Sequence, residues 1–436
     1  IQADVQITDG IITAIGPKLV ATVEDQIVDA TGKYVLPGII DAHTHYKMAN
    51  PTDVTADDFE SGTKSAACGG VTTYIDYAEP IEGKTLLEVL AARQEEANGH
   101  SYLDYHSHVV VTGWHDFDYD ELEQLARSGI SSLKIFTTYG TERLPDDKIK
   151  KLFAKAKELG LLVTVHAEDD AIVTSLKKKF LKEGKTGVRY HAESRPNEAE
   201  EKSVETILNM AKEVEAPVYI VHVSTGEAAE IIKSSQEAGQ KVLGETCPHY
   251  LLLTSACYQE PEGQKYIMTP PLRTKRDQKM LWEALRNGTF QCITTDHCAY
   301  NLTQKLRTDS CFTTLPGIPG SETLLPLIYS EGVTKGRISI EQLVGFLATN
   351  PAKIFGLYPQ KGVLGVGSDG DVTILDPEKE VILTGSGLHS AAGYTPFEGI
   401  KVKGYPIMTI LRGNILYQDG KFASQRPKGQ FIRARF

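Results

Sequence analysis

Four histidines and one aspartate directly follow short apolar segments that have the character of β-strands. His43 and His45 follow residues 35–40, His166 follows 161–165, His222 follows 218–221 and Asp296 follows 293–295. His43 and His45 are two residues apart on an extended segment, so their imidazoles point to the same side. Two such imidazoles can hold a divalent cation, commonly Zn²⁺ at ~2.0–2.1 Å. The other three residues are ligands of the same kind, so the set predicts a metal site.

A lysine, Lys134, lies within another apolar segment, residues 131–136. A buried ammonium is unfavourable unless it is paired or neutral, although a lone lysine at a strand end usually extends its amine to solvent. A nearby cluster of cations would disfavour the charged form further. A neutral amine can add CO₂ and become a carbamate, which is an anion able to bridge two metals, but the spacing alone does not establish this chemistry.

The elements that must position these residues alternate between helix and strand from about residue 35 to about residue 355. Ile149, Leu152, Phe153 and Ala156, for example, have helical spacing, and the apolar segment 161–165 follows them. Continuous apolar strands between amphipathic helices are typical of a parallel sheet that is covered on both faces. Six or more such units favour a (β/α)₈ barrel over an open sheet. In a barrel the carboxyl ends of all strands open onto one face, so the residues above would meet there.

Both ends of the chain predict β structure. Residues 3–7 and 11–15 flank Asp9-Gly10, which is typical of a hairpin with a type I′ turn, and a short strand is expected at 26–29. Further strands are expected at 372–375, 407–411 and 414–417. The simplest assembly is one small β domain made of residues 1–34 and 359–436, next to a barrel of residues 35–358.

The composition restricts the classes of function. The chain has 436 residues, of which 41% are hydrophobic and 24% charged, which is an ordinary globular composition. The net charge of −11 disfavours nucleic acid as a partner. No apolar stretch reaches the ~18 residues that a membrane span needs, and no signal peptide is recognisable. The six cysteines lack a Cys-x-x-Cys pair, so we expect reduced thiols in a cytoplasmic protein.

Taken together, the segments resemble the cyclic amidohydrolases, in particular the hydantoinase/dihydropyrimidinase family, over essentially the whole chain. The segments that carry the resemblance are PGIIDAHTH (37–45), AACGGVTTYIDY (66–77), SSLKIFTTYG (131–140), TVHAEDD (164–170), YHAESRP (190–196), IVHVSTGEA (220–228), ETCPHYL (245–251), TPPLR (269–273), TTDHCAY (294–300), NPAKIFGLYPQKG (350–362) and GSDGDV (367–372). This ordered set is far more specific than the His-x-His pair alone.

The resemblance implies a (β/α)₈ TIM barrel, a small β-sandwich built from both chain ends, two divalent metal ions, usually Zn²⁺, and a homotetramer. The residues that match the family's metal ligands are His43 and His45 for one ion, His166 and His222 for the other, Lys134 as the carboxylated bridging lysine, and Asp296 as a ligand that also shuttles a proton. Tyr139 matches the tyrosine that donates to the oxyanion. Thr269 matches the residue whose backbone holds the substrate ring.

The reaction that the resemblance implies is hydrolysis of the cyclic amide bond of hydantoins or dihydropyrimidines to N-carbamoyl amino acids, by a hydroxide that bridges two metals. One departure concerns the substrate. The family usually has Pro-Asn-Gly where this chain reads LPGIPG (315–320), and Pro316 has a carbonyl acceptor but no N–H donor. Phe136 either lines a pocket for a substituent of the ring or packs in the interior. Asp41 either orients a ligand imidazole or has a structural role.

Three alternatives stay open at this point. Allantoinase shares the metal site; Tyr139 favours hydantoinase, whereas the missing Asn and the ending at 427–432 leave allantoinase possible. Dihydroorotase ranks third, because Lys47 stands where that enzyme usually has an Arg, and lysine lacks the bidentate guanidinium. Non-catalytic scaffold relatives have lost metal ligands that this chain keeps, which disfavours that class.

Overall fold

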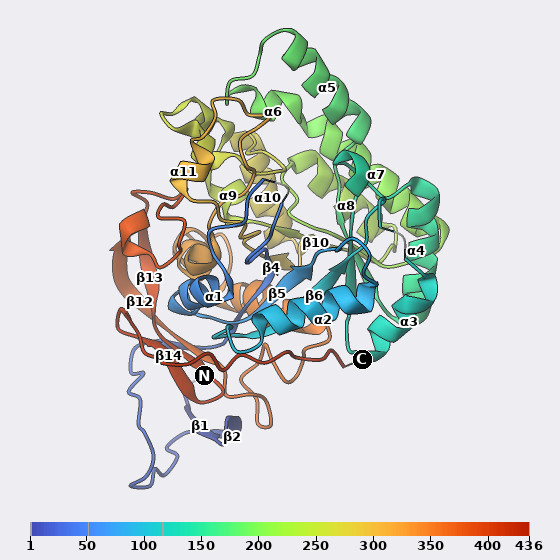
Figure 1. Ribbon diagram of the computed structural model, residues 1–436. Helices are drawn as coiled ribbons and strands as arrows, with labels where there is room; N and C mark the ends of the chain where they lie inside the picture. Colours follow the sequence, from blue (N-terminus) through green and yellow to red (C-terminus); the bar gives the residue numbers. More distant parts are fainter. Residues whose placement is uncertain (1, 51, 116, 436) are drawn as a thin grey trace.

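Eight parallel strands form a closed barrel in a computed structural model, which describes residues 2–50, 52–115 and 117–435 (Figure 1). The strands, each paired with its successor in the chain, are β4 (Ile39–Thr44), β5 (Val71–Ala78), β6 (Asp104–Val110), β7 (Ser132–Phe136), β8 (Leu162–His166), β9 (Val218–Ile220), β10 (Val242–Thr246) and β11 (Cys292–Ile293). The sheet closes where Thr44 forms a parallel bridge with His297, and where His45 N donates to His297 O at 2.7 Å. The predicted (β/α)₈ fold is confirmed.

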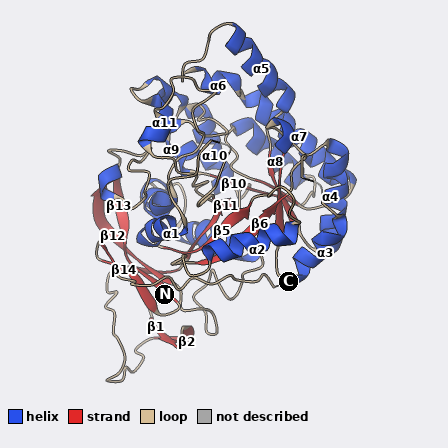
Figure 2. Ribbon diagram, in the orientation of Figure 1, coloured by secondary structure: helices blue, strands red, loops and turns tan. Residues whose placement is uncertain are grey.

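Helices surround the strands (Figure 2). The longer ones are α1 (Phe59–Cys68), α2 (Leu86–Ala97), α3 (Tyr119–Arg127), α4 (Asp146–Leu159), α5 (Asp170–Lys182), α7 (Asn197–Glu213), α8 (Gly226–Glu237) and α10 (Lys275–Arg286). The shorter ones are α6 (Tyr190–Ser194), α9 (Pro248–Leu252), α11 (Leu302–Lys305), α12 (Leu324–Ile328), α13 (Ile340–Val344) and α14 (Asn350–Ile354). In α4 the residues with helical spacing, among them Leu152 and Phe153, are buried together as expected. Within the described ranges, no helix combines the length and apolar character that crossing a membrane requires.

The two chain ends together build the smaller β domain. A five-stranded antiparallel sheet has the order β15-β14-β13-β12-β3, with β3 (Tyr34–Pro37), β12 (Val372–Ile382), β13 (Lys401–Leu411), β14 (Asn414–Gln418) and β15 (Lys421–Phe422). The hairpin of β1 (Asp4–Thr8) and β2 (Ile11–Gly16) turns at Asp9-Gly10, where φ is 51° and 82°, as a type I′ turn requires. Ile7 of the hairpin packs on the apolar face of the five-stranded sheet.

Two strand predictions differ from the structure. The apolar run at 34–40 is divided between both sheets, since β3 pairs with β12 whereas β4 pairs with β5. Gly38 lies at the division, where a Cβ atom would lie 2.0 Å from Thr72 Oγ1, so only glycine fits this crossing. The strand expected at 26–29 is wrong, because that segment has no β pairing. The domain boundaries at 34/35 and 358/359 stay predictions.

The C-terminal segment covers the end of the barrel at which the strands begin. Phe431 forms a parallel bridge with Tyr105, near the start of β6, and Ile432 N donates to Tyr105 O at 2.7 Å. The side chain of Ile432 is buried in a cluster with Ile40 and Ile75 of the barrel strands. The opposite end, where the predicted site residues lie, is therefore left as the mouth of the barrel.

Candidate active site

His43, His45 and Asp296 meet at the barrel mouth. Nε2 of His43 and Nε2 of His45 each lie 3.2 Å from Asp296 Oδ1. One ligand atom from each of the three residues lies within 4.8 Å of the other two, although the residues come from opposite ends of the barrel sequence. Asp296 has a left-handed backbone with φ of 50°, a strained conformation for a non-glycine residue that concentrates at functional sites.

His166 and His222 form a second pair beside the first. Nδ1 of His166 lies 2.9 Å from Nε2 of His222, and the His222 ring centroid lies 5.5 Å from that of His43. Burial lowers the pKa of His43, His166 and His222, which favours the neutral imidazole that a metal requires. Two neutral ring nitrogens that face each other so closely need a proton or a cation between them. The structure thus brings all four predicted histidine ligands together.

Lys134 lies inside the same group of rings. Its side chain is 1% exposed, and Nζ lies 5.2 Å from the centroids of both the Tyr77 and Phe136 rings. The Tyr77 ring in turn stacks on His45, with centroids 4.6 Å apart. Burial lowers the pKa of Lys134 to about 8, although the Asp296 carboxylate opposes the shift. A neutral amine, the form that reacts with CO₂, is therefore accessible near neutral pH.

Two buried glutamates lie behind the histidines. Nδ1 of His43 lies 2.5 Å from Glu245 Oε1, and Nε2 of His166 lies 2.8 Å from Glu168 Oε2. Burial acts to raise the pKa of Glu168, but Arg195 and His166 outweigh it and lower this pKa to about 2. A carboxylate on the far nitrogen fixes the tautomer and directs the other nitrogen to the site. This arrangement is the one that metal-binding histidines adopt, so the donor set fits divalent cations.

These two glutamates are functional candidates that the sequence reasoning missed. Glu245 lies in the strand β10, where its side chain is 1% exposed. A charged residue in a buried strand needs a partner, which is the argument that singled out Lys134. The same signal applied to Glu245 would have indicated a paired carboxylate.

Tyr139 lies next to the second histidine pair. Its hydroxyl is 3.1 Å from His166 Nε2 and donates to Thr269 Oγ1 at 2.7 Å. The Phe136 ring lies 5.8 Å from the Tyr139 ring, centroid to centroid. Burial raises the pKa of Tyr139, so the phenol keeps its proton and remains a hydrogen-bond donor. Tyr139 also has a left-handed backbone, with φ of 74°. The predicted substrate residues Tyr139, Thr269 and Phe136 are therefore neighbours.

Comparison with known proteins identifies the family. Residues 34–416 match the amidohydrolase family. The chain belongs to this family. The amidohydrolase is 41% identical to a D-hydantoinase of Ralstonia pickettii, over 100% of this chain and 95% of the relative. The crystal structure of dihydropyrimidinase from Brevibacillus agri NCHU1002 superposes with a TM-score of 0.96 at 39% identity, covering 99% of this chain and 95% of that one. An L-hydantoinase (dihydropyrimidinase) from Arthrobacter aurescens has a TM-score of 0.90 at 30% identity, with 99% and 96% covered.

Pro316 lies on a segment of the amidohydrolase that connects the Thr269 region to the Asp296 region. Next to Pro316, Gly317 N donates to Ile267 O at 2.9 Å. On the other side, Cys298 N donates to Ile318 O at 3.1 Å. Pro316 itself is exposed, which is compatible with contact to a small molecule at the mouth.

Asp41 does not orient a ligand imidazole, so that possibility is wrong. Its carboxylate accepts from Thr295 N at 3.1 Å, from Thr295 Oγ1 at 2.6 Å and from Ser321 Oγ at 3.2 Å. Asp41 instead fixes the residue before Asp296 and thereby the exit of the chain from β11. Asp41 is not needed at His43, because Glu245 of the amidohydrolase already contacts Nδ1 of that ring.

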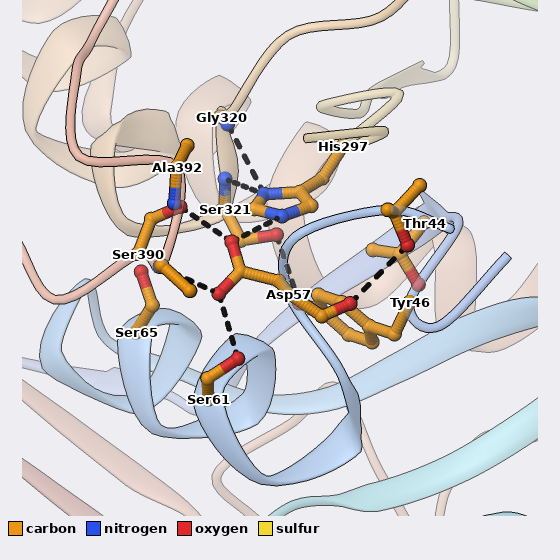
Figure 3. Close-up of polar contacts among 12 residues, drawn as sticks. Thr44, Tyr46, Asp57, Ser61, Ser65, His297, Gly320, Ser321, Ser390 and Ala392 are labelled. Atoms are coloured by element: carbon orange, nitrogen blue, oxygen red, sulfur yellow. Dashed lines mark hydrogen bonds and ion pairs between the residues drawn. The ribbon is translucent and has the colours of Figure 1, made fainter. Parts of the chain in front are cut away.

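His297 and Asp57 form a buried pair next to Asp296 (Figure 3). His297 Nε2 lies 3.1 Å from Asp57 Oδ2, and Nδ1 accepts from the backbone N–H groups of Gly320 and Ser321, each at 3.2 Å. Because Nδ1 accepts, Nε2 carries the hydrogen and donates to Asp57. Asp57 also accepts from Ala391 N at 2.8 Å. This network connects the ligand-bearing strand ends of the amidohydrolase to its C-terminal part.

Proposed function

We propose that this amidohydrolase hydrolyses the cyclic amide bond of hydantoins or dihydropyrimidines and releases N-carbamoyl amino acids. The observation that carries the proposal is the convergence of four histidines, Asp296 and buried Lys134 at the barrel mouth, with a protonated Tyr139 beside them. The full-length relatives described above bear hydantoinase and dihydropyrimidinase names, which favours this reaction over that of an allantoinase or a non-catalytic scaffold.

The donor set fits two divalent ions, which we propose to be Zn²⁺. His43, His45 and Asp296 would hold one ion, and His166 and His222 the other. Lys134 would lie between them as a carbamate, which forms when the neutral amine attacks CO₂ and loses a proton. When bound, the ions would supply a water with a pKa lowered to about 7 and would polarise the substrate carbonyl.

The protein's own residues would handle the proton and the developing charge. The Asp296 carboxylate, whose Oδ1 lies 3.2 Å from Nε2 of both His43 and His45, would accept the proton of the attacking water. Asp296 would then deliver this proton to the leaving ring nitrogen. The Tyr139 hydroxyl, which donates to Thr269 Oγ1 in the structure, would turn its single hydrogen to the oxyanion during the reaction.

A hydrolysis panel tests the proposal. The metal-loaded protein is given hydantoin, dihydrouracil, both enantiomers of a 5-aryl hydantoin, allantoin and dihydroorotate. We expect turnover of the hydantoins or of dihydrouracil. The rates for the two 5-aryl enantiomers show which enantiomer the enzyme prefers. A clear preference for allantoin, or no hydrolysis of any cyclic ureide, would contradict the proposal.

Lys134→Ala tests the bridging role. We expect the variant to lose activity and to bind less metal by elemental analysis, because the anion between the two ions is removed. Lys401→Ala is the control, since Lys401 is exposed in the small sheet. Full activity in Lys134→Ala would refute the carbamate.

We also propose a cytoplasmic homotetramer. The six cysteines are free, as expected for a reducing compartment. The loop between β2 and β3 extends away from the body (Figure 1) and exposes Val20, Val23 and Ile27, whose side chains would be covered in an assembly. Light scattering coupled to size exclusion should give the mass of four chains, and Val23→Asp should reduce it if this loop forms a contact.

A further inference from the structure

Lys305 is a fully buried lysine that the mechanism above does not use. It ends the short helix α11, its side chain is 0% exposed, and its ammonium points inward. Nζ donates to Ile267 O at 2.7 Å, to Leu315 O at 2.7 Å and to Gly317 O at 2.9 Å. An ammonium has three donors, and all three are taken by backbone carbonyls. A buried cation whose partners here are carbonyls rather than carboxylates is unfavourable in general, so its position calls for an explanation.

The three carbonyls belong to the two segments that carry the proposed substrate residues. Ile267 is two residues before Thr269, whereas Leu315 and Gly317 flank Pro316 on both sides. Gly317 N also donates to Ile267 O at 2.9 Å, which joins the two segments directly. The ammonium and this backbone hydrogen bond together fix how the Thr269 and Pro316 segments lie relative to each other.

Helix α11 holds Lys305 firmly in this place. Asn301 caps the helix by accepting from Gln304 N at 2.9 Å. Gln304 Nε2 in turn donates to Val54 O at 2.9 Å, and Arg307 pairs with Asp53 at 2.7 Å. The helix is thus tied to the loop that follows His45, which fixes the position of Lys305.

The chemistry of Pro316 makes the position of the carbonyls important. Proline has no N–H, so at Pro316 the backbone can offer a substrate ring only a carbonyl acceptor. A cyclic ureide presents ring N–H donors, which need an acceptor at a fixed place. Lys305 holds the carbonyls of Leu315 and Gly317, the residues on both sides of Pro316.

We propose that Lys305 is a positioning residue for substrate binding. It fixes the backbone segments at Thr269 and Pro316 so that a carbonyl of these segments accepts the ring N–H of a cyclic ureide. The inference rests on the proposed function. Without the ammonium, the carbonyls of Leu315 and Gly317 would lose this donor and Ile267 O would keep only Gly317 N, and an unsatisfied buried carbonyl moves or recruits water. Burial also lowers the pKa of Lys305, so the carbonyls are needed to keep it charged.

Lys305→Met tests the inference, because methionine is similar in length and has no donor. We expect KM for the preferred substrate of the metal-loaded enzyme to rise at least about tenfold, with kcat within about threefold and metal content unchanged. Lys305→Gln keeps two donors and should give an intermediate KM. Lys275→Met, at an exposed position at the start of α10, is the matched control and should leave both constants unchanged.

The outcomes separate a positioning role from a purely structural one. An unchanged KM in Lys305→Met overturns the inference, and so does a fall in kcat that parallels loss of metal or of folded protein. If Lys305→Met does not fold, Lys305→Gln provides the test, because a wild-type KM in that variant would equally overturn the inference. A wild type that hydrolyses no cyclic ureide defeats the proposed function and the inference together, whereas an active wild type matched by Lys305→Met contradicts the role of Lys305 alone.

Discussion

The histidines at the barrel mouth have their tautomers set by the residues behind them. Glu245 contacts Nδ1 of His43, whereas Glu168 contacts Nε2 of His166. The nitrogen that remains free therefore differs between the two rings: it is Nε2 in His43 and Nδ1 in His166. In both cases the free nitrogen is the one that faces another predicted ligand.

Glu245→Gln should weaken metal binding without removing a ligand. The amide can still contact His43, but it carries no negative charge to strengthen the imidazole as a donor. Loss of such a partner typically costs about 10–100-fold in metal affinity. Competition with a chelator measures the change. Glu380→Gln, in an exposed pair with Lys401, is the control, and equal affinities in both variants would contradict the role of Glu245.

Tyr139→Phe should lower kcat by about 10²–10³ if the phenol donates to the oxyanion. KM should change little, because the donor acts mainly on charge that develops in the transition state. Steady-state kinetics on the preferred substrate give both constants. The exposed Tyr358 provides a control, as Tyr358→Phe should be fully active. A Tyr139→Phe enzyme with wild-type kcat would exclude the assignment.

How far the sequence predicts the site depends on the kind of residue. His166 and Asp296 were predictable, because ligands at the carboxyl ends of parallel strands meet whatever the details of packing. Lys305 was not, since its partners are backbone carbonyls of distant loops and carbonyls have no sequence signature. The role of Asp41 was left open between two alternatives for a related reason: alternation gives the face of a side chain but not its partner across the barrel.

At the scale of elements, the ligand-bearing ends of the barrel depend on one closure. The last strand, β11, is only two residues long, and the chain beyond it joins β4 through the Thr44–His297 bridge. The side chain of His297 then pairs with Asp57, which accepts from Ser61 Oγ at the start of α1 at 2.8 Å and from Ala391 N at 2.8 Å. Asp57 therefore ties the closure of the barrel to α1 and to the C-terminal part of the chain.

Asp57→Asn should loosen this closure. The amide nitrogen would face donors, so at least one buried group would lose its acceptor, and we expect a loss of about 1–3 kcal/mol in the free energy of unfolding. Hydrogen exchange of residues 44–47 and 318–321 should accelerate in the folded protein. Unchanged exchange in these segments would show that the closure does not depend on Asp57.

The same pair predicts a dependence on pH. Burial acts to raise the pKa of Asp57, but His297 and the other donors outweigh it and lower this pKa below 3.8. A carboxyl with a depressed folded-state pKa stabilises the protein fully above its unfolded-state pKa of about 4, and this contribution is lost as the pH falls below that value. The stability difference between wild type and Asp57→Asn should therefore narrow in acid. A stability difference between wild type and Asp57→Asn that stays constant down to about pH 3 would contradict this prediction.

The elements themselves were predictable to different degrees. Helix α4 and strand β8 have a clear period and length, and the strand expected at 161–165 lies within one residue of the bounds of β8. The run at 34–40 was not resolved into β3 and β4, because an apolar segment looks the same in either sheet. What separates them is the contact of Gly38 with Thr72, which only the assembled structure contains.

At the scale of the whole molecule, one buried lysine joins the barrel to the small β domain. Nζ of Lys361 lies 2.5 Å from Asp104 Oδ2 in the barrel strand β6, 2.8 Å from Asp369 Oδ2 and 2.7 Å from Asp371 Oδ2 at the entry to β12. Arg412 at the end of β13 pairs with the same Asp104. The side chain of Lys361 is 1% exposed, so these carboxylates share a cation away from solvent.

Lys361→Met should destabilise the protein far more than it affects the active site. Removing the cation leaves Asp104, Asp369 and Asp371 buried together, and breaking a buried pair in this way typically costs about 3–5 kcal/mol. Urea unfolding should show the loss, and folded Lys361→Met should keep the wild-type KM because the barrel mouth lies at the opposite end of the strands. Lys401→Met, which removes an exposed pair with Glu380, should cost at most about 1 kcal/mol. Equal unfolding midpoints for the two variants would show that this junction does not hold the two domains together.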